Sequence, residues 1–75
     1  MAKSVYKELA FAPIEGNREI VISEFSDGGF TLAQRINVQE GERQTSVYMK
    51  NSIHVPTMEA LVNLRDAINT AIETF

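Results

Sequence analysis

The stretch "GFTLAQRINVQEGERQTSVYMK", Gly29 to Lys50, decides the fold, because it predicts two β-strands around a tight turn. Gly41 lies in that turn and supplies the positive φ that short hairpins favour. Apolar side chains alternate with polar ones along both strands, so the hairpin predicts one apolar and one polar face. The predicted apolar face carries Phe30, Leu32, Ile36, Val38, Val47 and Met49. The predicted polar face carries Thr31, Arg35, Asn37, Ser46, Tyr48 and Lys50.

Two further strands are predicted before this hairpin. Turn signals at "EGN" and "DGG" separate segments rich in β-branched and aromatic residues. We predict strands over about 5–14, 18–25, 30–39 and 43–49, with a short extended stretch over 53–55. Because the connections are short, consecutive strands are expected to pair as an antiparallel meander.

The alternation in the first two strands assigns their side chains to the same two faces. In the second strand, Ile20 and Ile22 belong to the apolar face, and Val21, Ser23 and Phe25 to the polar face. In the first strand, Leu9 and Phe11 are expected to point inward, while Tyr6, Glu8 and Ala10 point outward.

A helix is predicted over about 57–74, in "TMEALVNLRDAINTAIETF". Thr57 is the expected N-cap, and Glu59 places a carboxylate in the first turn. One apolar stripe follows at spacings of three and four residues: Leu61, Leu64, Ile68, Ala71 and Phe75. Flanking apolar residues make the stripe wider than one sheet contact needs, so we expect the helix to pack on its own sheet and on a partner's helix. The predicted fold is α+β, a curved four-stranded antiparallel meander followed by one helix (ββββα), as a single domain over 1–75 that dimerises.

The charges are unevenly distributed along the 75 residues. The net charge is −3, yet there is no carboxylate from Gly28 to Gln39 or from Arg43 to Met58. Those two spans hold Arg35, Arg43 and Lys50, whereas Glu8, Glu19 and Glu24 lie on the first two strands. We therefore expect a positive surface on the polar face of the last two strands, although overall acidity argues against crude charge-driven binding.

Aromatic rings, amide and hydroxyl groups and cations on an open sheet are suited to single-stranded nucleic acid, because bases stack on rings and cations hold phosphates. The candidate binding residues are Phe25, Thr31, Arg35, Asn37, Arg43, Ser46, Tyr48 and Lys50. Arg35 is expected to be exposed, so that its loss would weaken binding and leave folding intact. An ordinary solvated face is the alternative from composition. A second alternative is a dimeric protein-interaction module, in which Phe25, Tyr48 and Met49 make an apolar contact and Arg35 lies at its rim.

Two segments, "FSDGGFTLAQRI" (Phe25 to Ile36) and "SIHVPTMEALVNLRDAI" (Ser52 to Ile68), carry a resemblance to a known family. In element order and pattern the chain resembles the transcriptional coactivator family known as positive cofactor four, with its phage and bacterial relatives. The resemblance implies a ββββα fold that dimerises through its helices and binds single-stranded DNA on the sheet. It also implies that Phe25 is a stacking aromatic and Arg35 a phosphate-binding arginine.

This chain departs from the family pattern at several positions. Asp27 stands where members often carry lysine, the turn at Glu40–Glu42 is acidic, and there is no tryptophan, for which Tyr48 would have to substitute. These differences imply weaker or differently placed DNA contacts. The basic, serine-rich region that precedes the core in eukaryotic members is missing, so the resemblance implies a phage or bacterial core-only member, with transcription or replication proteins as further partners.

The sequence does not predict an enzyme. His54 is the only histidine and lies at a predicted strand end, and there is no cysteine. No spacing typical of a metal site, no phosphate-binding glycine loop before a helix and no cofactor motif is present. No apolar run is long enough for a signal peptide or a membrane span. We therefore expect a cytoplasmic protein with no membrane partner.

Overall fold

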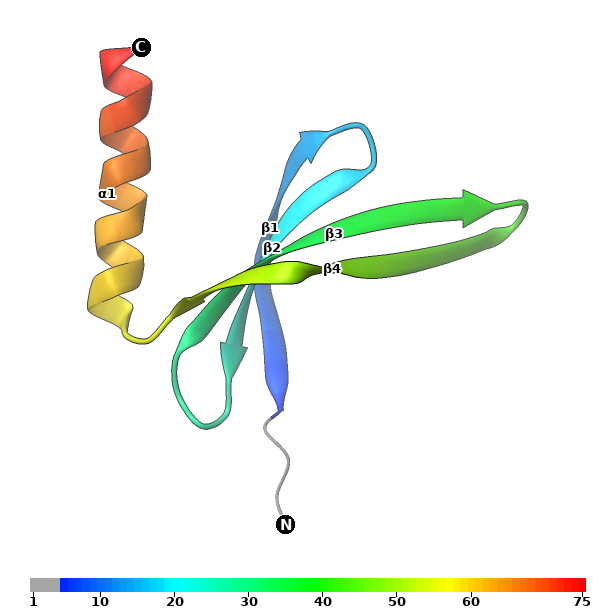
Figure 1. The fold of residues 1–75 in the computed structure, drawn as a ribbon, viewed down its shortest axis with the longest axis horizontal. Coiled ribbons are helices and arrows are strands. Elements are labelled where there is room, and N and C mark those ends of the chain that lie inside the picture. Colours follow the sequence, from blue (N-terminus) through cyan, green and yellow to red (C-terminus); the bar gives the residue numbers. More distant parts are fainter. Residues whose placement is uncertain (1–4) are drawn as a thin grey trace.

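The computed structural model describes residues 5–75, which form four strands and one helix. The elements are β1 (Tyr6–Glu15), β2 (Arg18–Phe25), β3 (Phe30–Glu40), β4 (Arg43–Val55) and α1 (Met58–Thr74). All neighbouring strands pair antiparallel in the order β1-β2-β3-β4, and the sheet is twisted and open (Figure 1). The predicted ββββα architecture is confirmed.

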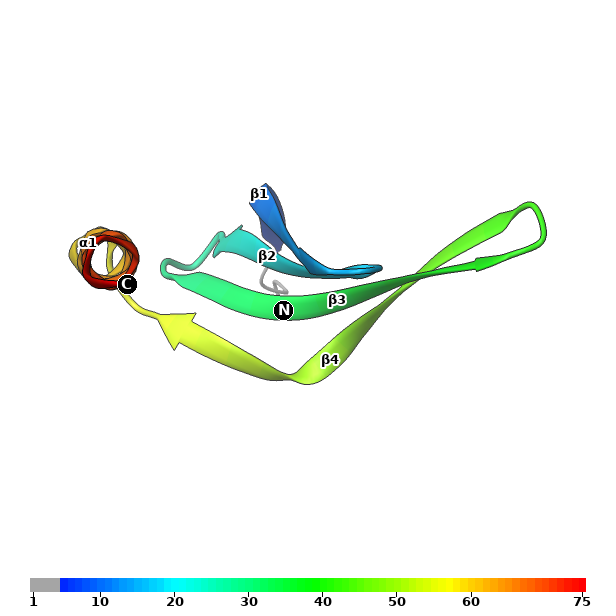
Figure 2. The same ribbon diagram turned by 90° about the horizontal axis from the view of Figure 1, so that it is seen from above.

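β4 is longer than predicted, because it continues from Arg43 to Val55 instead of ending at residue 49. Its register with β3 shifts on the way: Ala33 pairs with Ser52, but Arg35 pairs with Tyr48. The three residues 49–51 of β4 therefore lie opposite the single residue Gln34 of β3, and they form a bulge. β4 bends sharply about halfway along its length (Figure 2), which separates the strand into the two extended pieces that the sequence indicated.

A second bulge changes the predicted faces of β1. Glu8 pairs with Ser23 and Ala10 pairs with Ile22, so Leu9 is an extra residue in β1. The alternation is reversed beyond this point. Phe11 pairs with Val21 and shares the face of Glu8, so its predicted inward position is wrong; Ala10 moves to the opposite face for the same reason.

The helix α1 begins as predicted, with the Thr57 hydroxyl accepting a hydrogen bond from the Ala60 backbone N–H at 3.1 Å. It stands beside the sheet rather than over it (Figures 1 and 2), so the expected packing of the helix on its own sheet is not seen. An open cleft of about 270 Å³ separates α1 from the sheet. Its lining includes Ile22 and Leu32 from the strands and Leu61, Leu64 and Ile68 from the helix. Within residues 5–75, no helix is long and apolar enough to cross a membrane.

The core of this chain is small. In the part of the chain that the structure describes, the buried apolar residues are Val21, Phe30 and Val55. The radius of gyration is 14.5 Å, whereas a compact chain of this length has about 11 Å. The molecule is a thin slab of 44 × 41 × 18 Å. Much of the apolar surface that a globular domain would bury is therefore open.

Candidate functional site

One face of the sheet gathers most of the predicted site residues. Residues directly opposite in the register share a face, and Glu8, Ser23, Thr31 and His54 form one such row across all four strands. We call this side the aromatic face, since it carries aromatic side chains from three strands. Its members include Tyr6, Glu8, Phe11, Glu19, Phe25, Thr31, Arg35, Asn37, Ser46, Tyr48, Ser52 and His54.

A shallow hollow of about 250 Å³ lies on the aromatic face. It is lined by Tyr6, Ser23, Phe25, Thr31, Ala33, Tyr48, Met49 and Ser52. The Tyr6 and Phe25 rings lie 6.3 Å apart between centroids, tilted by 60°. The lining residues include no Asp, Glu, Lys, Arg or His. They carry hydroxyl groups from Tyr6, Ser23, Thr31 and Ser52 in addition to that of Tyr48. The hollow can therefore accept a flat, uncharged group that stacks on rings and forms hydrogen bonds.

The β4 bulge places Met49 in this hollow. The alternation predicts Met49 on the apolar face with Val47, and the structure shows this to be wrong, because Met49 lines the hollow together with Tyr48. A residue within a bulge is released from strict alternation. A flexible thioether therefore joins the rings.

The β2–β3 turn holds Phe25 next to His54. The Phe25 backbone N–H donates to the Gly29 carbonyl at 3.1 Å, and Gly29 has a φ of +87°. A Cβ at position 29 would lie 3.0 Å from His54 Cε1, so the missing side chain of Gly29 makes room for the imidazole. Phe25 and His54 also line a second, more open depression with Asp27 and Gly28. His54 therefore extends the aromatic face beyond Phe25.

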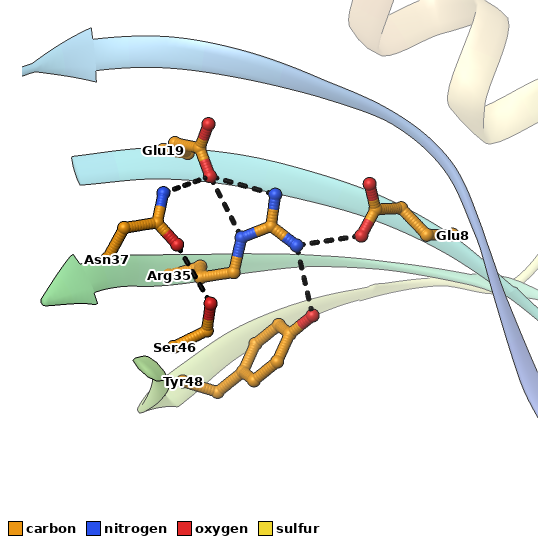
Figure 3. Close-up of polar contacts among 6 residues, drawn as sticks. All are labelled: Glu8, Glu19, Arg35, Asn37, Ser46 and Tyr48. Atoms are coloured by element: carbon orange, nitrogen blue, oxygen red, sulfur yellow. Dashed lines mark hydrogen bonds and ion pairs between the residues drawn. The ribbon is translucent and has the colours of Figure 1, made fainter. Parts of the chain in front are cut away.

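Arg35 lies at the centre of a polar network next to the hollow (Figure 3). Its Nε donates to Glu19 Oε1 at 2.9 Å, and its Nη2 lies 2.8 Å from the same oxygen. Its Nη1 donates to Glu8 Oε1 at 2.7 Å and to the Tyr48 hydroxyl at 3.4 Å. The Arg35 side chain is only 14% exposed. The expectation that Arg35 is an exposed, unpaired cation is therefore wrong.

The two carboxylates also change the charge of this face. Glu8 and Glu19 come from β1 and β2, and both lie against Arg35, so the three residues together carry one net negative charge. The sequence predicted a positive surface from the charges of β3 and β4 alone. Glu8 and Glu19 reach the same face from the neighbouring strands, so this surface is not positive. Hydrogen bonds from Asn37 and then Arg35 hold the pKa of Glu19 below its ordinary value. The pKa of Arg35 is raised above its ordinary value by its hydrogen bonds to Glu19, Glu8 and Tyr48.

Two rings lie near the guanidinium. The Arg35 Cζ lies 5.6 Å from the centroid of Phe11 and 5.9 Å from that of Tyr48. Phe11 reaches this position only because of the Leu9 bulge. Arg35 therefore connects the rings of β1 and β4 across the sheet.

The remaining predicted residues divide into two groups. Asn37 donates to Glu19 at 2.8 Å and accepts from the Ser46 hydroxyl at 2.9 Å, so both belong to the Arg35 network. Arg43 lies at the far end of the β3–β4 hairpin, opposite Glu40, and Lys50 lies in the β4 bulge; both are exposed. The structure thus brings Phe25, Thr31, Arg35, Asn37, Ser46 and Tyr48 together, and leaves Arg43 at a distance.

The predicted nucleic-acid-binding residues did not include Tyr6, Phe11, Met49 or His54, although the protein-interaction alternative included Met49. Tyr6 could have been found, because the alternation already placed it outward and it pairs with Phe25. The positions of Phe11 and Met49 on this face depend on bulges, and no residue in either segment is a local sequence signal for a bulge. Within residues 5–75, no group of three or more metal-ligating side chains could hold a metal ion.

Comparison with known proteins found no matching family model, no matching curated protein and no matching solved structure. The resemblance to the positive-cofactor-four family therefore stays a prediction.

Proposed function

We propose that this protein is a non-catalytic, homodimeric single-stranded DNA-binding protein that holds the strand on the aromatic face. The observation that carries the proposal is the uncharged, ring-lined hollow on an open sheet. The proposed setting is transcription, or replication and recombination, in a bacterial cytoplasm or in the host cytoplasm of a phage.

Unpaired bases fit the chemistry of the hollow. An unpaired base offers a π face for Tyr6, Phe25 or Tyr48 and polar edges for the surrounding hydroxyls. Stacking on such rings contributes about 1–3 kcal/mol per base and depends little on sequence. In a duplex the same π faces are covered by neighbouring bases, so the hollow favours single strands or unpaired regions.

Among the residues that the structure describes, few cations lie near the hollow to contact the phosphates. Lys50 follows Met49, which lines the hollow, and it is exposed; Arg43 is exposed at the end of the same hairpin. Arg35 is paired with Glu8 and Glu19. We therefore propose a weak electrostatic contribution, with stacking as the main source of affinity and a second copy doubling the number of phosphate contacts.

The surface area supports a dimer. A compact monomer of 8.4 kDa exposes about 4,600 Å², whereas this chain exposes 6303 Å². The difference is about twice the roughly 800 Å² that each partner buries in a standard interface. A second copy of this chain is the occupant that we propose for the open apolar surface.

The helix offers the surface for that contact. Ile68 is 51% exposed, and Ile72 and Phe75 are still more exposed, so no part of their own chain covers them fully. The proposed dimer contact is the predicted stripe of Leu61, Leu64, Ile68, Ala71 and Phe75. Because Leu61, Leu64 and Ile68 also line the cleft beside the sheet, the partner's helix would fill that cleft.

The test is titration of a labelled oligothymidylate at low and high salt. We expect binding that weakens as salt rises, and Phe25→Ala should weaken it by about 5- to 150-fold, the range for one stacked base. Ile53→Ala is the matched control, because Ile53 is exposed on the opposite face. No binding by the unmodified protein or its variants at low salt would contradict the proposal.

A protein-interaction module is the second candidate. The presence of Met49 beside Tyr6, Phe25 and Tyr48 favours it, because methionine and aromatic residues are common in protein interfaces. In that case oligonucleotides should not compete for the hollow, and Phe25→Ala should leave any residual oligonucleotide binding unchanged.

A further inference from the structure

The two glutamates on Arg35 are held very differently. Glu19 is 14% exposed, and it contacts Arg35 Nε and Nη2 as well as the Asn37 side chain. Glu8 is 39% exposed and makes a single contact, to Nη1. Figure 3 shows Glu8 approaching the guanidinium from the end opposite Asn37. Glu19 is thus a fixed partner of Arg35, and Glu8 is the partner that can leave.

From this asymmetry we infer that Glu8 occupies a phosphate site: the position at Arg35 Nη1 and the Tyr48 hydroxyl is filled by the Glu8 carboxylate in the free protein and by a phosphodiester of the bound strand in the complex. The inference rests on the proposed function and adds its regulation. Glu8 is an internal competitor of the ligand and keeps its affinity low.

The chemistry of the site fits the exchange. A phosphodiester oxygen carries the same charge as a carboxylate and accepts the same N–H donors from a guanidinium. The Tyr48 hydroxyl lies 3.4 Å from Nη1, within reach of an anion bound there. Replacing one monoanion with another leaves the charge around Arg35 unchanged, and Glu19 continues to hold the guanidinium in place.

The position of the site relative to the hollow supports the same ligand. Tyr48 belongs to both, since it lines the hollow and its hydroxyl accepts from Arg35. A nucleotide with its base in the hollow therefore has its phosphate close to Nη1. No charged side chain of residues 5–75 lines the hollow itself, so the anionic part of the ligand is expected at its border.

Glu8 is also placed where it can swing away. β1 is an edge strand, and Glu8 directly precedes the Leu9 bulge, where regular pairing with β2 is interrupted. Its side chain can turn into solvent without breaking a backbone pair.

Glu8→Gln tests the inference, with Glu24→Gln as the control. Both variants remove one negative charge, but Glu24 lies on β2 on the opposite face. We expect Glu8→Gln to tighten binding of an oligothymidylate about fivefold more than Glu24→Gln does, the effect of releasing one exposed charge pair. The Arg35→Gln/Glu8→Gln double variant should lose this gain, provided its far-ultraviolet circular dichroism shows that it is folded.

The outcomes separate the two proposals. Equal affinities for Glu8→Gln and Glu24→Gln, with clear binding by the unmodified protein, would overturn the role of Glu8 and leave DNA binding intact. Binding by Glu8→Gln alone would support both proposals. Absence of binding by every chain at low salt would overturn both.

Discussion

One carboxylate oxygen of Glu19 is contacted by three nitrogen atoms, one from the Asn37 side chain and two from Arg35. These donors favour the ionised form and lower the pKa of Glu19 below the ordinary value of a glutamate, 4.5. A carboxylate whose pKa is lower in the folded state stabilises the fold above its unfolded pKa, and this contribution is lost as the pH falls through the folded pKa. The network is therefore an acid-sensitive part of the sheet.

The corresponding measurement is the urea midpoint as a function of pH. We expect the midpoint of the unmodified protein to fall as the pH drops below about 4.5, and the profile of Glu19→Gln to be flatter there. Glu24→Gln, on the other face, should keep the steep profile. Identical profiles for the unmodified protein and Glu19→Gln would show that the network does not stabilise the fold.

Arg35→Ala should lower stability, in contrast to the expectation from the sequence. The substitution leaves Glu8 and Glu19 without their cation and removes the guanidinium beside Phe11 and Tyr48. Arg43→Ala removes the same charge from an exposed turn and should change the thermal midpoint little. Thermal unfolding followed by circular dichroism compares the two, and equal midpoints would contradict a structural role for Arg35.

Away from the bulges the sequence predicts which residues share a face, but it does not predict their partners. Glu8 and Arg35 are 27 positions apart, and they meet only because β1, β2 and β3 pair in one particular register. Phe25, Thr31 and Tyr48 follow from alternation alone, and the structure places all three in the hollow.

Apart from the end of β4, the strands and the helix begin and end close to the predicted positions, because Gly-containing turns and the Thr57 cap mark them directly. The bulges at Leu9 and at 49–51 were not predicted, because they depend on cross-strand register rather than on a local residue signal. Their effect is large, since they move Phe11 and Met49 onto the aromatic face.

The turn between β2 and β3 gives a prediction at the level of elements. Gly29→Ala adds a Cβ at a positive φ and 3.0 Å from His54 Cε1, whereas Gly41→Ala adds one at a positive φ with open space around it. We expect Gly41→Ala to cost about 1 kcal/mol of unfolding free energy and Gly29→Ala to cost more. Gly29→Ala should also weaken oligonucleotide binding, because it moves His54 and the adjacent Phe25. Equal costs in urea unfolding would mean that His54 moves aside freely.

The oligomeric state of the whole molecule determines its mass in solution. We expect twice 8.4 kDa for the unmodified protein, and a monomer of lower stability for Ile68→Asp, because an ionised carboxylate in the apolar contact would be desolvated. Asn63→Asp introduces the same charge at an exposed position outside the stripe and should remain dimeric. Light scattering coupled to size-exclusion chromatography measures both, and a dimeric Ile68→Asp would exclude this interface.

The irregular strands have one more consequence, which concerns fibre formation. β1 and β4 are the two edges of an open sheet. Unpaired backbone N–H and C=O groups at such edges can pair with strands of further molecules and so build a fibre. β1 carries register shifts at Leu9 and Ile14 and a proline at position 13, and β4 carries three unpaired residues at its bend. Within residues 5–75, neither edge offers a long, regular row of donors and acceptors to a neighbouring sheet. The same bulges that shape the aromatic face thus disfavour growth along the edges, and this agrees with the helix side as the surface that we propose for self-association.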